Sequence, residues 1–498
     1  MHDISVRNSY VGGEAAAVRS RDKSAPEAAR GRLVSKLRAH IPGRRLVADS
    51  DLYLPDHPLS RDQVLPAVLA LEAMAQTAAL LTSSRCVPAF ENVEFLRPVV
   101  VPAGSPATIS VAAVSEGDRV EVAVRDGDPE ADHVRATLRY PAGGPPRTGA
   151  RRPVTDASRV PLDPSTDLYR DIAFRGRRLN RLVGYRKLGA TSCVAEISTS
   201  ADGGWLAESL LGDPAIRHAF VDAIQGCVPT ATLRPVSVER IYPAGSFGAD
   251  GLAGDTGQVL LYAAERRRHA GTYTYDLDIH AASGALLERW EGLRLVTVHE
   301  HEAAKPWVPA LLGPHIERKL ASILPHRLSC VVEPEAGDAD SRLGQIRAAV
   351  TRMLGRPALV WHRRDGKPEV AEEGLNVSAA HDAGLMIAVL GPQRVSCDAR
   401  AVHPRLAGEW EVLLGAEGFA LAERIHTEQG EPLPVAATRV LGALECLREA
   451  GWSAAGDVTL TRSGPDGWVQ LSSGQARIAT FQARLRDEPR PVVFTVVA

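Results

Sequence analysis

The chain has few cysteines and no long hydrophobic run, and so lacks the features typical of disulfide-bonded secreted proteins, zinc-binding proteins and membrane proteins. Its six cysteines are far apart and form no CxxC pair, which argues against a disulfide framework or a cysteine-based zinc site. No apolar run reaches the roughly 18 residues that a membrane helix needs, and the first 30 residues hold no signal-peptide core. The net charge is only −2, which argues against nucleic acid as a partner. We therefore expect a cytoplasmic protein with reduced thiols that are buried or incidental.

What the chain does contain is an ordinary globular composition, with 45% hydrophobic and 24% charged residues. At roughly 100–200 residues per domain, its 498 residues predict about three domain-sized units. Proline- and glycine-rich stretches and polar runs set the expected boundaries. In chain order we expect a flexible N-terminal extension, a compact unit, a linker, a second unit, a linker helix and a third unit, over residues 1–44, 45–145, 146–160, 161–305, 306–328 and 329–498.

The first two units share one order of elements, a helix followed by strands. In the first unit, apolar residues from 66 to 81 recur at helical spacing, and alternating patterns then predict strands at 93–101, 107–114, 119–125 and 133–140. The second unit repeats this with a helix at 211–228 and strands at 237–242, 258–263, 272–280 and 287–299. The third unit mixes both signals, as an α/β fold does, with helices at 341–354 and 435–450 and strands near 357–362, 384–390, 393–399, 457–461 and 467–471.

One segment of the first unit carries a pattern with chemical meaning. The run Leu54-Pro55-Asp56-His57-Pro58 places a histidine after a turn-forming Pro-Asp pair. Residues 65–76 follow, in which a proline opens an alanine-rich helix with a single glutamate, Glu72. Together they resemble the signature of hotdog-fold dehydratases, DH followed by P-x-V-L-x-x-E-A-x-A-Q. Those enzymes remove water from β-hydroxyacyl thioesters on carrier proteins, and the resemblance implies His57 as the base.

Dehydration needs a base for the α-proton and an acid for the departing hydroxyl. A histidine and a carboxylic acid in an apolar slot can supply both, because burial raises the pKa of the acid and keeps it protonated. In the tandem-hotdog members of the family, the polyketide synthase dehydratases, the acid is an aspartate on the helix of the second hotdog. The matching position in this chain holds His218, and the family's Gln/His position one turn later holds Asp222.

The exchange of these two residue types leaves three alternatives. Residues i and i+4 of a helix share one face about 6 Å apart, so Asp222 can reach the slot of the expected acid. His218 can donate a proton as an imidazolium, or the exchange has ended catalysis. The family's H-x-x-x-G-x-x-x-x-P pattern is also incomplete, because Arg61 stands at its glycine. Glu72 occupies the acid position of single-hotdog enzymes, and we expect it to be structural in a tandem fold.

The third unit carries a second set of ordered motifs. These are Gly366-Lys367-Pro368, then residues 376–381 ending in a histidine, then residues 395–400, then residues 437–451. Their order and spacing resemble the 4′-phosphopantetheinyl transferases, which move phosphopantetheine from coenzyme A to a carrier-protein serine with Mg²⁺ held between diphosphate and carboxylates. The resemblance implies Asp398 and Glu445 as metal ligands and Lys367 and His381 as CoA-phosphate contacts.

The match to the transferases departs from the pattern at several positions. The second metal carboxylate is replaced by Arg400, whose charge should repel Mg²⁺, although a guanidinium can instead clamp a diphosphate in bidentate fashion. The tryptophan and both lysines of the last motif are replaced by Leu441, Leu444 and Glu449. The resemblance therefore implies the fold, with Arg400 as a candidate CoA contact, and leaves metal-dependent activity open.

Taken together, the motifs predict an α+β double hotdog over residues 45–305 followed by a phosphopantetheinyl transferase-like α/β domain. This order resembles the C-terminal end of iterative enediyne-type polyketide synthases, which make antibiotics. The resemblance implies a dehydratase, a lyase that acts on a β-hydroxyacyl chain of an acyl carrier protein. The alternative is a catalytically degenerate didomain that binds a carrier protein or polyketide without turnover.

The same resemblance sets the expected cofactors and partners. Dehydration needs none, whereas the C-terminal domain would use CoA and Mg²⁺. A carrier protein is the expected partner, without nucleic acid or membrane, and a homodimer is a further expectation. No ketosynthase cysteine motif or carrier Asp-Ser-Leu motif is found in the chain, which leaves a stand-alone protein and a piece of a larger synthase both open.

Overall fold

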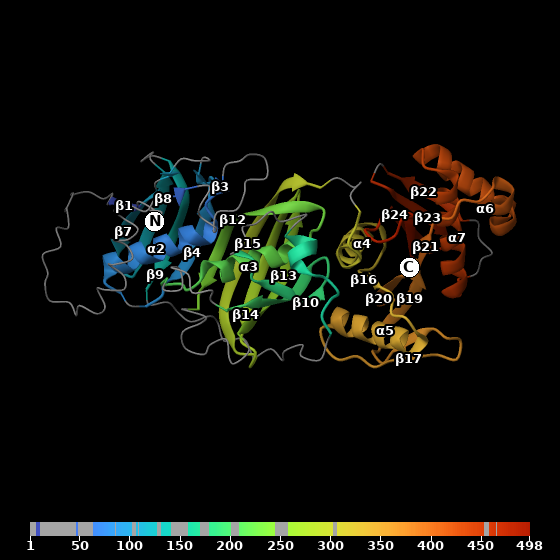
Figure 1. The fold of residues 1–498 in the computed structure, drawn as a ribbon, viewed down its shortest axis with the longest axis horizontal. Coiled ribbons are helices and arrows are strands. Elements are labelled where there is room, and N and C mark those ends of the chain that lie inside the picture. The colour runs from blue at the N-terminus through green and yellow to red at the C-terminus, as the bar shows by residue number, and fades with distance from the viewer. Residues whose placement is uncertain are drawn as a thin grey trace, which may run out of the picture.

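The computed structural model arranges the chain as three units in a row, with the two N-terminal units on the left and centre of Figure 1 and the C-terminal unit on the right. The structure describes residues 6–9, 46–47, 63–84, 86–101, 106–107, 109–126, 131–140, 158–169, 179–200, 209–244, 257–301, 306–452, 458–464 and 466–498. Among these residues, no helix has the length and hydropathy needed to cross a membrane.

The first unit is a helix packed on an antiparallel sheet. Helix α2 (Ala67–Thr82) is buried over most of its surface, and Pro66 precedes it as the N-cap instead of lying inside its first turn. Its alanines leave little side-chain bulk, so the strands approach the helix closely. The sheet is built from β4 (Ala89–Phe95), β7 (Ile109–Glu116), β8 (Arg119–Asp126) and β9 (Asp132–Arg139). Short ladders pair β2 (Leu46–Val47) with β6 (Pro106–Ala107), and β3 (Gln63–Val64) with β5 (Val100–Val101).

The second unit repeats this design around helix α3 (Pro214–Gln225). A short π-helix, η1 (Pro164–Leu168), precedes its sheet. The strands are β10 (Leu182–Leu188), β11 (Ser192–Ser198), β12 (Ala231–Tyr242), β13 (Gln258–His269), β14 (Thr272–His280) and β15 (Leu286–Glu300). Helix-in-sheet geometry is therefore present twice, and the double hotdog that the sequence predicts is confirmed.

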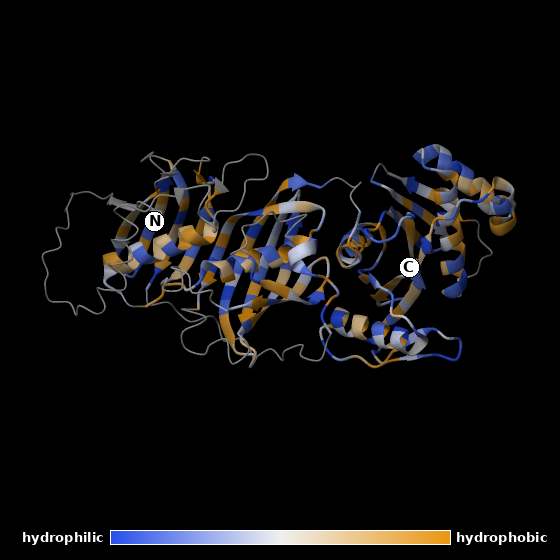
Figure 2. Ribbon diagram, viewed as in Figure 1, coloured by the Kyte–Doolittle hydropathy of each residue, from blue (hydrophilic) through white to orange (hydrophobic). Residues whose placement is uncertain are grey.

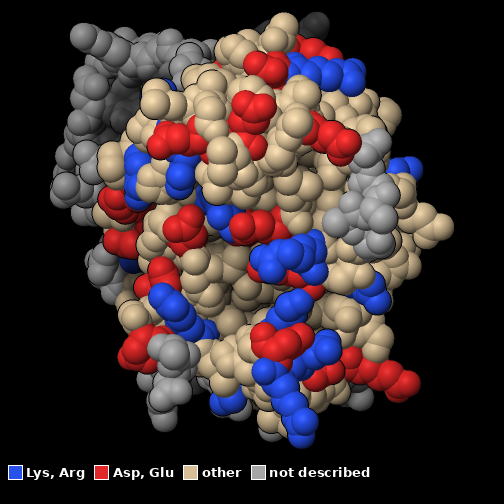
Figure 3. Space-filling view, turned by 90° about the vertical axis from the view of Figure 1, so that its right-hand side faces the viewer, with Lys and Arg blue, Asp and Glu red and all other residues tan. Residues whose placement is uncertain are grey.

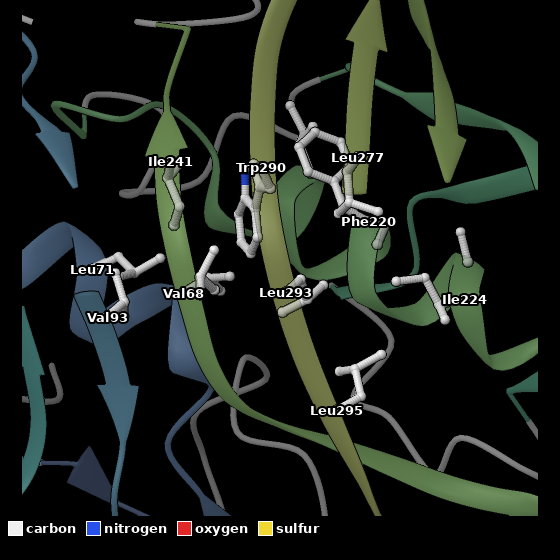
Figure 4. Packing of buried hydrophobic residues seen from close by; sticks show 14 of the residues in the cluster. Val68, Leu71, Val93, Phe220, Ile224, Ile241, Leu277, Trp290, Leu293 and Leu295 are labelled. Atoms are coloured by element: carbon white, nitrogen blue, oxygen red, sulfur yellow. The ribbon is translucent and has the colours of Figure 1, made fainter. Parts of the chain in front are cut away.

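The two hotdogs share one sheet and one core. Strand β4 pairs antiparallel with β12, with Val93 opposite Val238, and this joins the strands into an 11-stranded sheet of order β1-β7-β8-β9-β4-β12-β15-β14-β13-β11-β10. Figure 4 shows side chains of both hotdogs in a single apolar cluster that includes Leu71 of α2, Phe220 of α3 and Trp290 of β15. Hydrophobic and hydrophilic residues alternate along many strands in Figure 2, as expected where one face of a sheet is covered.

The C-terminal unit is built from two small sheets and their helices. One sheet has the order β16-β20-β19 and the other β21-β25-β24-β23-β22, and a separate ladder pairs β17 with β18. The elements are α4 (Pro309–Ile323), β16 (Ser329–Pro334), α5 (Ala339–Leu354), β17 (Val360–His362), β18 (Pro368–Val370), β19 (Asn376–Asp382), β20 (Leu385–Gly391), β21 (Ser396–Ala401), α6 (Ala407–Gln429), α7 (Leu433–Glu449), β22 (Thr459–Ser463), β23 (Trp468–Ser473), β24 (Ala476–Ala483) and β25 (Val492–Val497). Acidic and basic side chains are interspersed over the end of the molecule that this unit forms (Figure 3).

The structure differs in part from the extension and linkers that the sequence predicts. Helix α4 forms within the expected linker segment 306–328, but its apolar residues pack into the same core as β20 and β21, so it belongs structurally to the C-terminal unit. Within the expected flexible extension 1–44, Val6–Ser9 forms strand β1 and pairs in parallel with β7. The rest of that extension, and most of the linker 146–160, lies outside the described residues.

Candidate active sites

The base implied by the family resemblance, His57, lies outside the described residues, as does Arg61. The described chain resumes just before α2, where the backbone N–H of Leu65 donates to the carbonyl of Val99 at 3.0 Å. This contact fixes the start of the helix that follows the His57 segment in sequence. The two candidate proton donors lie in the second hotdog, whose helix the structure describes in full.

Both candidate proton donors lie on the buried face of α3. Asp213 caps this helix by accepting from the N–H of Ala215 at 2.9 Å, and Arg181 holds the same aspartate at 2.8 Å. One and two turns further on, His218 is 7% exposed and Asp222 is 1% exposed. Their Nε2 and Oδ1 atoms are 3.7 Å apart, which is within ion-pair reach. The exchange of residue types noted in the sequence thus leaves an imidazole and a carboxylate together in the interior.

Helix α3, which carries this pair, is held by contacts on both sides of it. Phe220 packs edge-on against Trp290, with ring centroids 6.3 Å apart. The carbonyl of Ala223 accepts from the hydroxyl of Tyr185 at 2.9 Å, which anchors the C-terminal half of α3 to β10. Burial raises the pKa of Tyr185 well above its usual value, and the charges of neighbouring groups add to this. Tyr185 is therefore a neutral anchor at physiological pH.

A buried ion pair that the sequence gives no sign of fixes the first half of α3. Arg217 and Glu288 are 2% and 0% exposed, and the guanidinium reaches both carboxylate oxygens at 3.0 and 2.6 Å. Arg217 also donates to the carbonyls of Leu211 and Ala244. Glu288 accepts in addition from the indole N–H of Trp290 at 2.7 Å and from the N–H of Ala244 at 3.0 Å. Every group of the pair has partners, so the pair can hold the backbone beside His218 in one position.

Glu72 has the structural role that its place in a tandem fold predicts. Its carboxylate accepts from the backbone N–H groups of Leu210 and Leu211 at 2.7 and 2.8 Å, and from the side chain of Gln76. Burial raises the pKa of Glu72, and these hydrogen bonds oppose the rise. A carboxylate of α2 thereby orders the turn that leads into α3, which couples the two helices.

In the C-terminal unit, the structure brings together three of the residues implied by the transferase resemblance. Asp398 and Arg400 point to one side of β21, and Glu445 comes from α7. Arg400 donates through Nε to Asp398 and through a terminal nitrogen to Glu445. We call these three residues the arginine-bridged cluster. Burial raises the pKa of Asp398, and the neighbouring Arg400 guanidinium opposes the rise.

The arginine-bridged cluster does not suit a divalent metal. The guanidinium of Arg400 already occupies the space between the two carboxylates and neutralises charge that Mg²⁺ would need. Within the described part of the chain, no group of three or more His, Cys, Asp or Glu side chains is placed to hold a metal ion. The transferase resemblance implies that Asp398 and Glu445 bind Mg²⁺. In the structure the Arg400 guanidinium lies between them, where the metal ion would have to bind.

The other two expected CoA contacts are placed differently. The ammonium of Lys367 donates to the carbonyl of Glu449, at the end of α7 that follows Glu445. His381 lies on β19, and no hydrogen bond or ion pair of the described residues joins it to the arginine-bridged cluster. Burial lowers the pKa of His381 and favours the neutral imidazole. Lys367 therefore lies beside α7 with the cluster, whereas His381 stands apart.

Family models match most of the double hotdog. Residues 31–126 match the model described as polyketide synthase dehydratase domain, and residues 146–305 match the model described as polyketide synthase dehydratase N-terminal domain. The comparison with curated proteins found no significant match.

Solved structures similar to the chain include dehydratase domains of polyketide synthases. The dehydratase domain from the CurF module of curacin polyketide synthase is 17% identical to this chain, with a TM-score of 0.41. The match covers 51% of this chain and 92% of the CurF domain. GphF dehydratase 1 is 21% identical, and the dehydratase domain of PpsC from Mycobacterium tuberculosis, in complex with C12:1-CoA, is 17% identical. Each has a TM-score of 0.39, covers 51% of this chain and is itself covered over 92% of its length. With its two family matches, the double hotdog of this chain is a polyketide synthase dehydratase region.

Proposed function

We propose that the double hotdog removes water from a β-hydroxyacyl chain that is bound as a thioester to an acyl carrier protein. His57 takes the α-proton, and the His218–Asp222 pair delivers a proton to the β-hydroxyl as it departs. The C–H and C–O bonds break, a double bond forms between the α and β carbons, and the hydroxyl leaves as water. The observation that carries this proposal is the buried pair on α3, within a region that matches dehydratase models.

The electrostatics of α3 support a proton donor at this position. A carboxylate 3.7 Å from a histidine stabilises the protonated imidazole as an ion pair, so the pair can hold a proton for a leaving group placed against it. His218 and Asp222 are 7% and 1% exposed, so the interior around them excludes water, which strengthens interactions with charge that develops during the reaction. The Arg217–Glu288 pair keeps the backbone under His218 in place. These features fit either Asp222 or His218 as the group that gives up its proton.

A direct test uses a β-hydroxyacyl thioester of a carrier protein or of pantetheine. We expect the full chain to release one water per thioester, measured as a mass loss and as absorbance of the enoyl product. His57→Ala should abolish this reaction because no base remains. The matched control is His280→Gln, a change of a buried histidine of β14 whose ring bonds the carbonyl of Gly284. If His57→Ala keeps the full rate, the assignment of the base is wrong.

A second candidate function is favoured by the arginine-bridged cluster. We infer that the C-terminal unit has a phosphopantetheinyl transferase-like fold that binds a carrier protein or CoA without transfer, because Arg400 stands where a metal would be needed. Mass spectrometry of an apo carrier protein with CoA, Mg²⁺ and the full chain tests this directly. Retained CoA without added phosphopantetheine supports binding only, whereas modification of the carrier serine contradicts it.

We propose three finer properties from the resemblance of the motifs. The polyketide is of the enediyne type, the partner is an acyl carrier protein, and the protein works as a homodimer. Light scattering of the purified chain tests the dimer, and pull-down with carrier proteins from enediyne and other polyketide pathways tests the partner. A monomer, or equal binding of all carriers, would contradict the corresponding property.

A further inference from the structure

A groove lined by arginines lies where the second hotdog meets the C-terminal unit. It is formed between β13 and α4, which face each other in Figure 1, and its volume is about 360 Å³. We call it the arginine groove after the five arginines that line it, Arg266, Arg267, Arg268, Arg318 and Arg327. Two glutamates, Glu265 and Glu317, also line it. Arg318 and Glu265 of the groove contact Cys227 and Tyr275 of the shared core, but neither His218 nor Asp222 lines the groove.

An irregularity in β13 explains how three consecutive arginines line one groove. Side chains of a regular strand alternate between the two faces. The pairing of β13 with β14 shifts register between Glu265 and Arg267, so that Arg266 is an extra residue on the β13 side. A bulge of this kind re-aims the side chains that follow it. Arg266, Arg267 and Arg268 therefore all reach the groove.

Among the described residues, carboxylate partners are found for two of the five arginines. Arg266 is held by Asp276 and by Glu239, at 2.6 and 2.7 Å. Arg318 pairs with Glu265 at 2.8 Å, and although burial works against its charge, this contact raises the pKa of Arg318 overall. The remaining three, Arg267, Arg268 and Arg327, form no ion pair with any carboxylate of the described residues.

The acidic residues of the groove do not neutralise these three arginines. Glu265 is already committed to Arg318. Glu317 accepts from the backbone N–H groups of Ala190 and Cys330, and burial raises the pKa of Glu317 despite those bonds. Within the described part of the chain, the groove thus concentrates positive charge that no carboxylate pairs with, in a protein whose net charge is −2.

We propose that the arginine groove binds a small phosphate-bearing ligand with two linked phosphates. Guanidinium groups bind phosphate oxygens through paired hydrogen bonds, and several of them converge here. The ring of Tyr273 lies under both Arg268 and Arg318, at 5.7 and 5.3 Å, which orients the guanidiniums before a ligand arrives. A volume of about 360 Å³ accommodates a diphosphate group.

The test uses the full chain and two probes, inorganic pyrophosphate and ADP, titrated calorimetrically at low ionic strength. The double variant Arg267→Gln/Arg268→Gln should weaken binding of the phosphate probes at least tenfold. The matched control is Arg462→Gln, an exposed arginine of β22 outside the groove. Unchanged thermal unfolding of both variants shows that they remain folded. Tighter binding of ADP than of pyrophosphate identifies an organic diphosphate as the ligand, and the reverse order identifies free diphosphate.

Two results would overturn the proposal. One is the absence of pyrophosphate and ADP binding, or binding that the double variant leaves unchanged. The other is groove-dependent binding of a poly-glutamate peptide without binding of either phosphate probe, which would make the groove a docking surface for an acidic protein. Neither result bears on dehydration, because no residue of the groove belongs to the proposed dehydratase site.

Discussion

Removing one partner of the buried Arg217–Glu288 pair should destabilise the second hotdog strongly. In Arg217→Met the Glu288 carboxylate keeps, among the described residues, the N–H groups of Trp290 and Ala244, and the carbonyl of Leu211 loses the guanidinium that donates to it. Breaking a buried ion pair on one side costs about 3–5 kcal/mol, because a charge is left without its counterion. The pair is 2% and 0% exposed, so solvent cannot replace the lost partner.

The assay for this prediction is a double-mutant cycle followed by urea unfolding. Arg217→Met and Glu288→Gln each leave one uncompensated group, whereas the combined variant leaves neither charge. We expect the combined loss to be smaller than the sum of the single losses by about 2 kcal/mol, within the range for groups in one network. Tryptophan fluorescence reports the transition, because Trp290 donates to Glu288. Strictly additive losses, or single losses below about 1 kcal/mol, would refute the argument that this pair holds α3.

Three further predictions concern the C-terminal unit. Burial lowers the pKa of His315 to about 4, whereas the side chain of the unfolded chain titrates near 6.5. The unfolded state therefore binds the extra proton first, and the free energy of unfolding should fall by about 2–3 kcal/mol as the pH drops from 6.5 to 4. Urea unfolding of His315→Phe at the two pH values should lack this loss. A Cβ at Gly313 would lie 2.9 Å from the carbonyl of Cys330, so Gly313→Ala should lower the melting temperature, whereas Gly344→Ala, with open space around it, should not. Arg400→Ala removes the guanidinium that lies between the Asp398 and Glu445 carboxylates. Mn²⁺ should then bind between them and raise the melting temperature of this variant but not of the native chain. Equal shifts in both proteins would contradict the view that Arg400 takes the place of a metal ion.

The elements that the sequence predicts well are those whose pattern is local. Helix α2 begins directly after Pro66 and is itself an apolar run. Helix α3 has Asp213 as its N-cap and Pro214 in its first turn. Strand β14 agrees to the residue with the expected 272–280, because its ends coincide with turn signals. The order of helix and strands then suffices to predict each hotdog.

The elements that were missed lack a clear period. Strand β25 is buried at every residue, so apolar/polar alternation is absent from it, and the sequence does not predict it. Strand β20 is buried in the same way, but the strand expected near 384–390 agrees with it. Helix α6 is broken by Gly415, which has a φ of 71°, and is exposed over much of its length. The strand expected at 93–101 is instead split into β4 and β5 around Pro98, since proline cannot donate to a sheet.

For the candidate sites too, the sequence predicts contacts between residues close together in the chain and misses those between distant residues. His218 and Asp222 could be placed together from sequence because they are one helical turn apart. Arg217 and Glu288 are 71 residues apart, and no local pattern links them. The position of Arg400 between two carboxylates needed the pairing of β21 with α7, which only the fold supplies. His57 remains a prediction, because it lies outside the described residues.

The central claim is that the buried imidazole–carboxylate pair of α3 delivers the proton to the departing hydroxyl. The most direct measurement is the single-turnover rate of enoyl thioester formation by Asp222→Asn/His218→Gln, compared with His280→Gln. Removal of a positioned acid should slow the chemical step by roughly 10²–10⁴-fold, while the control keeps the native rate. A double variant that is folded and dehydrates the thioester at the native rate would contradict the claim.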